Sequence, residues 1–198
     1  METHYKTLEK LFKTKSMPKC NEIVCSISDL WKTRVFKKYP DLKYCNSWLG
    51  KYAIQTVYIF SVVNFPYYLN DIEEKFKENN EISKKSTGEK KYSLPRRNKV
   101  SPEWDNVKTN KNVCLYVGSS DDFVQRLKEH LFLCNPDSYA LHLEKWFPKD
   151  LVITIKAWNF QDFLKDVTPL DLQYEYLQNI EDLLWNHYQP LFGRQGKK

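Results

Sequence analysis

The sequence has no long hydrophobic run. Its longest mostly apolar stretch, residues 57–63, is seven residues long and contains Ser61, whereas a helix across a bilayer needs about 20 apolar residues. Residues 1–6 do not contain the apolar segment that a secretory signal carries. We therefore expect no membrane span, and we expect the protein to be intracellular, in the cytoplasm or with the nucleoid, or in the nucleus of a eukaryote.

Glycine and proline are also scarce, with five and nine residues in a chain of 198. This scarcity excludes collagen-like and low-complexity chains. By contrast, 41% of the residues are hydrophobic and 15% are aromatic. A chain of this length and apolar content can bury a core, so the composition predicts a globular protein and excludes disorder along the whole length.

The five cysteines are an odd number spread over more than a hundred positions. Disulfide frameworks are typical of short secreted chains with closely spaced cysteines. Structural zinc sites usually show paired CxxC or CxxH spacings, whereas Cys20 and Cys25 have four residues between them and no second pair follows. The pattern predicts reduced thiols and disfavours structural zinc.

Short predicted helices and strands alternate along the chain. Apolar residues at helical spacing predict helices, and β-branched or aromatic runs predict strands. We expect helices over 2–14, 21–38, 71–79, 138–147 and 171–188, another helix that follows N-caps at Ser119 and Ser120, strands over 52–63, 113–117 and 151–158, and a polar loop over 80–112. Elements that interleave without repeats predict an α/β or α+β fold with a small central sheet flanked by helices.

Positive charge is concentrated in two segments of a chain whose formal net charge is +6. Residues 84–111 carry nine basic and three acidic residues, and residues 1–50 carry ten and five. Such a local excess attracts a polyanion such as nucleic acid, although lysine-rich loops are often only solvated. The candidate nucleic-acid contacts are Lys84, Lys85, Lys90, Lys91, Arg96, Arg97 and Lys99.

Arg126 and His130 are four residues apart on one predicted helix and therefore share a face. They lie near the end of a predicted strand that bears Tyr116. A cation and a proton-handling group at such a place suit an anionic substrate, but an ordinary helix with an exposed Arg and a partly buried His has the same spacing.

Residues 115–130 read LYVGSSDDFVQRLKEH. This segment resembles the second signature block of the GIY-YIG nuclease superfamily, with a Tyr-Val-Gly tripeptide, an Arg ten residues after its Tyr and a His four residues later. Residues 56–60 resemble the first signature, with Thr where the family often has Gly. Glu181, with Pro190 nine residues on, resembles the terminal block. The resemblance covers about residues 52–193 and implies a nuclease with a three-stranded, mainly antiparallel sheet.

Two departures from the family pattern stand out. The signature tyrosines, Tyr58 and Tyr116, are 58 positions apart, whereas the family commonly joins these strands by a much shorter turn. Gly193 stands where family members commonly have Asn. In addition, Tyr52 is a rival of Tyr58 for the first signature. We expect an N-terminal helical extension, residues 1–50, packed on a catalytic domain, residues 51–198, with an insertion at about 64–112.

The resemblance implies a reactive site made of Tyr58, Tyr116, Arg126, His130 and Glu181. Hydrolysis of a phosphodiester requires deprotonation of a water and stabilisation of charge on the phosphoryl oxygens. Arg126 suits a forked contact with phosphate, and Glu181 suits a hard divalent cation, Mg²⁺ or Mn²⁺, with Glu175 as a weaker rival. Either tyrosine or His130 can serve as the base.

These residues predict a metal-dependent endonuclease that hydrolyses DNA, with one active site per chain and a homodimer as one route to cutting both strands. Three alternatives stay open. They are an inactive nucleic-acid-binding module of the same fold, an RNA-directed nuclease, and an interaction scaffold that uses Trp31, Trp48 and Trp104.

Overall fold

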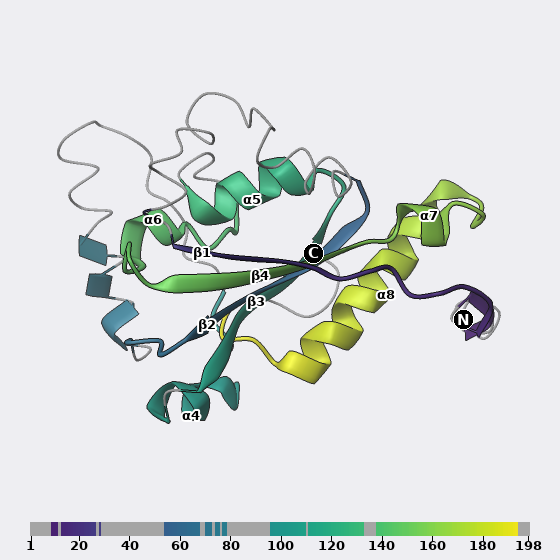
Figure 1. Cartoon of the computed structure of the whole chain (residues 1–198). Coiled ribbons are helices and arrows are strands. Elements are labelled where there is room, and N and C mark those ends of the chain that lie inside the picture. The colour runs from purple at the N-terminus through teal and green to yellow at the C-terminus, as the bar shows by residue number, and fades with distance from the viewer. Residues whose placement is uncertain are drawn as a thin grey trace.

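The computed structural model describes residues 9–11, 13–26, 28, 54–67, 70–72, 74–75, 77–78, 96–109, 111–132 and 138–193. The described strands form one four-stranded sheet in the order β1-β4-β2-β3 (Figure 1), and every neighbouring pair is antiparallel. The expected α+β class with an antiparallel sheet is confirmed, with four strands in place of three.

The described elements follow the chain in the order β1 (Asn21–Ser26), β2 (Thr56–Val63), α4 (Glu103–Lys108), β3 (Asn112–Ser120), α5 (Phe123–Leu131), α6 (Leu143–Trp146), β4 (Val152–Asn159), α7 (Gln161–Leu164) and α8 (Leu170–Tyr188). The described residues within 9–14 and 70–78 are helical, as expected. None of the helices described here is both long and apolar enough to cross a membrane.

Helices cover the sheet on both faces, with α5 and α6 on one side and α8 on the other (Figure 1). Along β2, Tyr58 and Phe60 pack in the cluster under α5, whereas Val57 and Ile59 pack toward α8. This division follows from the two-residue period of a strand. Because β2 is central and covered on both faces, seven of its eight residues are buried.

A β-bulge in β3 turns Tyr116 toward α5. Phe60 pairs with Tyr116, but the next residue, Ser61, pairs with Cys114, so Leu115 is an extra residue in the strand. Both Leu115 and Tyr116 pack on the α5 side, while Cys114 faces α8. The bulge therefore places the second signature tyrosine on the same face as the first.

The helix expected over 21–38 is wrong over residues 21–26, which form strand β1 at the edge of the sheet. Asn21 pairs with Ala157 and Ser26 with Val152. Ile23 packs against the core while Val24 on the other face is exposed, which is the alternation of a half-buried strand. Pairing with β4 outweighs the helical spacing of the apolar residues, because strand formation depends strongly on tertiary context.

The strand expected over 113–117 is longer, and Gly118 does not end it. Ser119 pairs with Val57 and Ser120 with Thr56, so neither serine caps the following helix. The N-cap of α5 is Asp122, whose side chain accepts a 2.9 Å hydrogen bond from the Gln125 N–H. A carboxylate at this position satisfies one of the free amides of the first turn.

The polar loop expected over 80–112 is wrong from residue 96 onward, because this part contains α4 and a segment whose main chain pairs with residues 191–193. Residues 96–98 run beside 191–193, with a bridge between Arg97 and Phe192, and Phe192 in turn bridges Tyr116. Main-chain hydrogen bonds of 2.8 Å join Asn98 to Leu191 and Gly193 to Arg96. The end of the insertion is thus fixed against the outer edge of β3. The predicted contacts Lys84, Lys85, Lys90 and Lys91 lie outside the described residues.

Candidate active site

Tyr58 of β2 and His130 of α5 form a hydrogen-bonded pair under the helix. The Tyr58 Oη lies 3.0 Å from His130 Nε2, and both side chains are completely buried. His130 Nδ1 accepts a 3.0 Å hydrogen bond from the Leu141 main-chain N–H. A neutral imidazole has one donor and one acceptor nitrogen. The Nε2 therefore carries the proton and donates a hydrogen bond to the Tyr58 Oη.

His130 is neutral at physiological pH. Burial lowers its pKa well below the ordinary value, and the nearby Arg126 and His142 lower it further. Burial also lowers the pKa of His142. The neutral state agrees with the hydrogen bond from Leu141, because a protonated imidazole would have no nitrogen left to accept it.

The two signature tyrosines stack directly beside a glycine. The rings of Tyr58 and Tyr116 are inclined by 17°, with centroids 6.2 Å apart. A Cβ on Gly118 would lie 2.6 Å from Tyr116 Cε1 and 2.8 Å from the Tyr58 Oη, closer than carbon atoms approach without displacement. The Tyr-x-Gly spacing therefore has a steric cause here, since only glycine leaves room for both rings.

Both tyrosines are protonated at neutral pH. Burial raises the pKa of Tyr58 well above its ordinary value, and Tyr116 raises it further, while Arg126 lowers it. For Tyr116, burial raises the pKa, Arg126 lowers it and Glu181 raises it. Deprotonation of either phenol at neutral pH consequently requires more positive charge beside the ring than Arg126 supplies.

Arg126 is held by two neighbours on the side of α5. Its Nη1 forms a 2.7 Å ion pair with Glu129 Oε2, and its Nη2 donates to the main-chain carbonyl of Tyr139 at 3.1 Å. The side chains of Arg126 and Glu129 are only 16% and 12% exposed. Since a guanidinium has five N–H donors in a fixed plane, these two contacts set the orientation in which the group faces the tyrosines.

Segment 138–142 contacts both predicted site residues of α5 through its main chain, with the Tyr139 carbonyl on Arg126 and the Leu141 N–H on His130. The Leu141 carbonyl in turn accepts a 2.7 Å bond from Trp146. The helix expected over 138–147 is wrong for residues 138–142, because these contacts occupy main-chain groups that a helix would use. Only Leu143–Trp146 is helical, after a left-handed His142 with φ 47°.

Glu181 of α8 approaches the pocket from the opposite face, at the end of β3. Its Oε2 accepts a hydrogen bond from the Ser119 hydroxyl, one residue beyond Gly118. Burial raises the pKa of Glu181, and the bond from Ser119 lowers it. The rival Glu175 is exposed on α8, so Glu181 is the acid placed for a role in the site.

The donor set around Glu181 fits a magnesium ion held by one carboxylate. In the part of the chain that the structure describes, no group of three or more His, Cys, Asp or Glu side chains is placed to hold a metal. Mg²⁺ commonly takes one or two carboxylates, with waters and substrate phosphate completing its shell. The carboxylate of Glu181, oriented by the Ser119 hydroxyl, is the group beside the two phenols that could hold such an ion.

The charges in the pocket do not favour a phosphate by themselves. The positive charge of Arg126 is offset by its ion pair with Glu129. The carboxylate of Glu181, which acts on the titration of both tyrosines, adds a negative charge. With His130 neutral, the ionised groups sum to about −1, so an incoming phosphate needs a further cation.

The structure brings together all five residues that the sequence predicts for the site. The hydrogen bonds and ring contacts above join Tyr58, Tyr116 and His130, Arg126 lowers the pKa of each of these three groups, and Glu181 acts on both phenols. Gly193, which stands where the family commonly has Asn, packs against the Tyr116 ring with φ 108°.

Sequence reasoning missed Ser119, Glu129 and segment 138–142. The Glu129 contact has a signal in the sequence, because residues three apart on a helix are neighbours. Segment 138–142 has none, since its contribution is made by main-chain groups. Comparison of the chain with known protein families, with curated proteins and with solved structures finds no match in any of the three.

Proposed function

We propose that the protein is a metal-dependent endonuclease of the GIY-YIG type that hydrolyses DNA phosphodiester bonds inside the cell. The observation that carries the proposal is the hydrogen-bonded chain from the Leu141 N–H through His130 to the Tyr58 Oη, next to Arg126. It supplies a phenol oriented by a neutral histidine beside a fixed cation, and these groups can together activate a water at a phosphate.

In this proposal Arg126 binds the non-bridging oxygens of the scissile phosphate. The guanidinium is permanently charged and matches phosphate in a forked contact. Its contacts with Glu129 and the Tyr139 carbonyl fix it before substrate arrives. Preorganised charge of this kind stabilises the negative charge that grows on the phosphoryl oxygens in the transition state.

Tyr58 is the proposed general base, and His130 positions it. Because the His130 Nε2 already carries a proton and Nδ1 is bound to Leu141, the histidine cannot accept the tyrosine proton without losing one of these contacts. When positive charge beside the ring releases the phenol proton to bulk water, His130 keeps donating its hydrogen bond to the phenolate oxygen. The phenolate then takes a proton from the attacking water.

Glu181 would hold the divalent cation, with its orientation set by Ser119. A divalent cation supplies positive charge that lowers the pKa of nearby acids and stabilises the leaving oxygen. This positive charge is what both the raised pKa of Tyr58 and the charge balance of the pocket require.

The proposed DNA contacts outside the pocket include Arg96, Arg97 and Lys99. Their segment is anchored to 191–193, which in turn bridges Tyr116 of β3, so its main chain is held next to the stretch that borders the site. One site per chain cuts one strand, and a homodimer is the simplest way to cut both.

A plasmid-nicking assay with and without Mg²⁺ tests the function, with an RNA substrate of equal length beside it. We expect Mg²⁺-dependent nicking that EDTA abolishes, that Glu181→Ala abolishes and that Arg126→Ala slows by roughly 10². Glu175→Ala, which removes an exposed acid from the same helix, should leave the rate unchanged. DNA binding without nicking would identify an inactive binding module, and preferential cutting of RNA would overturn the DNA assignment.

A further inference from the structure

Tyr139 is an exposed residue beside the candidate active site. Its main-chain carbonyl is 3.1 Å from Arg126 Nη2, so the residue is in direct contact with the group proposed to bind phosphate. Its side chain nevertheless points to solvent and is 59% exposed. A phosphate bound by Arg126 would therefore lie next to the main chain that carries this ring.

The backbone that carries this ring is firmly held. The next three residues, Ala140, Leu141 and His142, are completely buried, and the Leu141 N–H and carbonyl are bonded to His130 and Trp146. The main chain of Tyr139 is therefore fixed on one side by Arg126 and on the other by buried residues. A ring on a fixed backbone loses little conformational entropy when it packs against a ligand.

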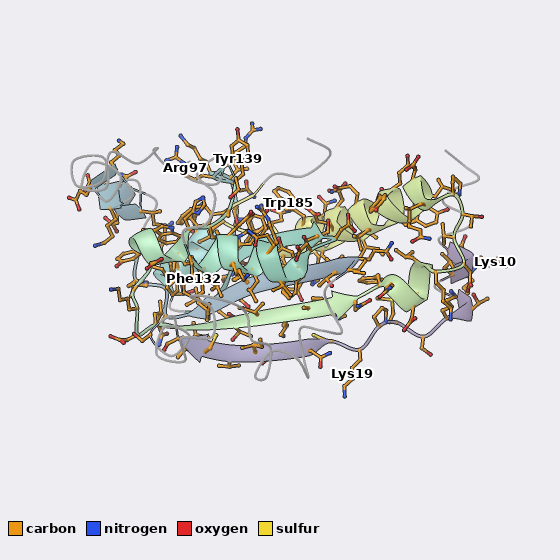
Figure 2. All side chains as sticks on the ribbon, turned by 90° about the horizontal axis from the view of Figure 1, so that it is seen from above. Lys10, Lys19, Arg97, Phe132, Tyr139 and Trp185 are labelled. Atoms are coloured by element: carbon orange, nitrogen blue, oxygen red, sulfur yellow. The ribbon has the colours of Figure 1, made fainter. Side chains whose placement is uncertain are left out.

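Positive charge lies on the same side of the molecule. Figure 2 shows Arg97 and Tyr139 projecting from one side of the ribbon, and Arg97 belongs to the segment anchored beside Tyr116 through Phe192. Aromatic rings interleaved with cations are the usual surface for unpaired nucleic acid, because the cations follow the phosphates and the rings stack on the bases.

From this juxtaposition we propose that Tyr139 is a binding residue for an unpaired nucleobase next to the scissile phosphate. The proposal rests on the proposed nuclease function and deepens it, since it assigns single-stranded character to the substrate at the cutting position. Stacking on Tyr139 orders the nucleotide whose phosphate Arg126 binds. Every base has an aromatic face, so the contact is tolerant of sequence.

A cycle of protein and DNA variants tests the proposal. The dissociation constant is measured in Ca²⁺ for a short single-stranded oligonucleotide and for the same length of DNA with abasic sites in place of its bases. Both DNAs carry the same phosphates. Every substitution at position 139 keeps the carbonyl that contacts Arg126, because that contact is a main-chain one.

We expect Tyr139→Ala to bind the oligonucleotide with bases roughly tenfold more weakly than wild type, the scale of one stacked base, and to bind the abasic DNA as wild type does. Tyr139→Phe and Tyr139→Trp should retain wild-type discrimination between the two DNAs. Tyr174→Ala is the matched control, because Tyr174 is a comparably exposed tyrosine, at 42%, on α8.

Equal losses on both DNAs, or no loss in Tyr139→Ala, overturn the stacking role. If wild type nicks plasmid while Tyr139→Ala shows no base-dependent loss, this inference alone fails. If wild type neither binds nor cuts DNA, the proposed function fails with it. Circular dichroism spectra of the four variants confirm that binding differences do not arise from unfolding.

Discussion

The Ser119 hydroxyl donates a hydrogen bond to Glu181 Oε2. This bond joins β3, the strand that carries Tyr116, to α8. Ser119 lies next to Gly118 on β3, and Glu181 lies in the second half of α8. The sheet and the helix thus fix the carboxylate with respect to the phenols, although Glu181 comes from the opposite face.

Ser119→Ala should weaken divalent-cation binding by about tenfold, the lower end of the effect of removing a group that orients a metal ligand. Loss of the hydroxyl also removes a contact that lowers the pKa of Glu181. The carboxylate must be ionised to bind a cation. The pH below which Mn²⁺ binding is lost should therefore be higher in the variant than in wild type. Calorimetric titration with Mn²⁺ from pH 5 to 8 measures both effects. Ser120→Ala, one residue further on β3, serves as the control; an unchanged titration for Ser119→Ala would remove the serine from the site.

Gly118→Ala should destabilise the fold and disrupt the pocket together. The added methyl would lie 2.6 Å from Tyr116 Cε1, and overpacking of this kind typically costs about 1–3 kcal/mol. Urea unfolding measures the free energy of unfolding, and near-ultraviolet circular dichroism reports on the packing of the two tyrosines. A variant with wild-type stability and spectrum would show that the strand shifts to accept a side chain.

Glu129→Gln should strengthen DNA binding in EDTA while lowering the cleavage rate in Mg²⁺. The substitution removes a negative charge that lies 2.7 Å from Arg126, so the pocket repels phosphate less. It also replaces a charged contact that orients the guanidinium with a weaker neutral one. Filter binding and single-turnover cleavage separate the two effects, with Glu175→Gln as the control for removing one acid. Weaker binding in EDTA would contradict the charge balance.

His130→Gln should reduce the acid sensitivity of stability. The folded protein holds His130 neutral because burial lowers its pKa, whereas an unfolded histidine protonates near pH 6.5. The unfolded chain therefore binds more protons below about pH 6.5, and the free energy of unfolding falls there by up to about 1.4 kcal/mol per pH unit for this residue. His142 contributes a slope of the same sign. Urea unfolding at pH 7.5, 6.5 and 5.5 measures the change, and the exposed His187 provides the control substitution. The same slope in His130→Gln and wild type would contradict the assignment.

Changing Arg96 and Arg97 together to Ala should flatten the salt dependence of duplex DNA binding. Each phosphate contact contributes about 0.9 to the slope of log affinity against log salt concentration, so the slope should fall by up to about 2. Turnover at saturating substrate should change less. The control variant changes Lys149 and Lys165 to Ala. Both lysines are exposed and lie in turns, one before β4 and one after α7, so the control removes the same charge from a different part of the surface. An equal effect of the control would show that only net charge matters.

Elements with their own amphipathic pattern were predictable from the sequence. Helix α8 begins one residue before the expected helix and ends at the same residue, and α5 is the helix expected after Ser120, with Phe123, Leu127 and Leu131 buried. Strand β1 was not predictable, because its short apolar pattern fits a helix equally well and only pairing with β4 decides between them.

That the five predicted site residues lie together agrees with their spacing in the sequence, but their contacts were not predictable. The ten-residue interval from Tyr116 to Arg126 is visible in the sequence. By contrast, the proton on His130 Nε2 depends on the Leu141 N–H, a main-chain group that every residue except proline has. The sequence therefore leaves the roles of these groups open, and the hydrogen-bond pattern speaks only against His130 as a proton acceptor.

The bridge between Arg97 and Phe192 bears on how such a protein tolerates change during evolution. The core residues Phe65 and Ile72 and this bridge fix the two ends of the chain that runs between Ile72 and Arg97, and a chain that is fixed at both ends can change its length at little thermodynamic cost. Doubling the length of a flexible loop costs only about 0.6 kcal/mol in closure entropy. The separation of 58 positions between Tyr58 and Tyr116 is therefore compatible with an unchanged arrangement of the two tyrosines, and the chain between Ile72 and Arg97 is where the length of the protein can change without displacing them.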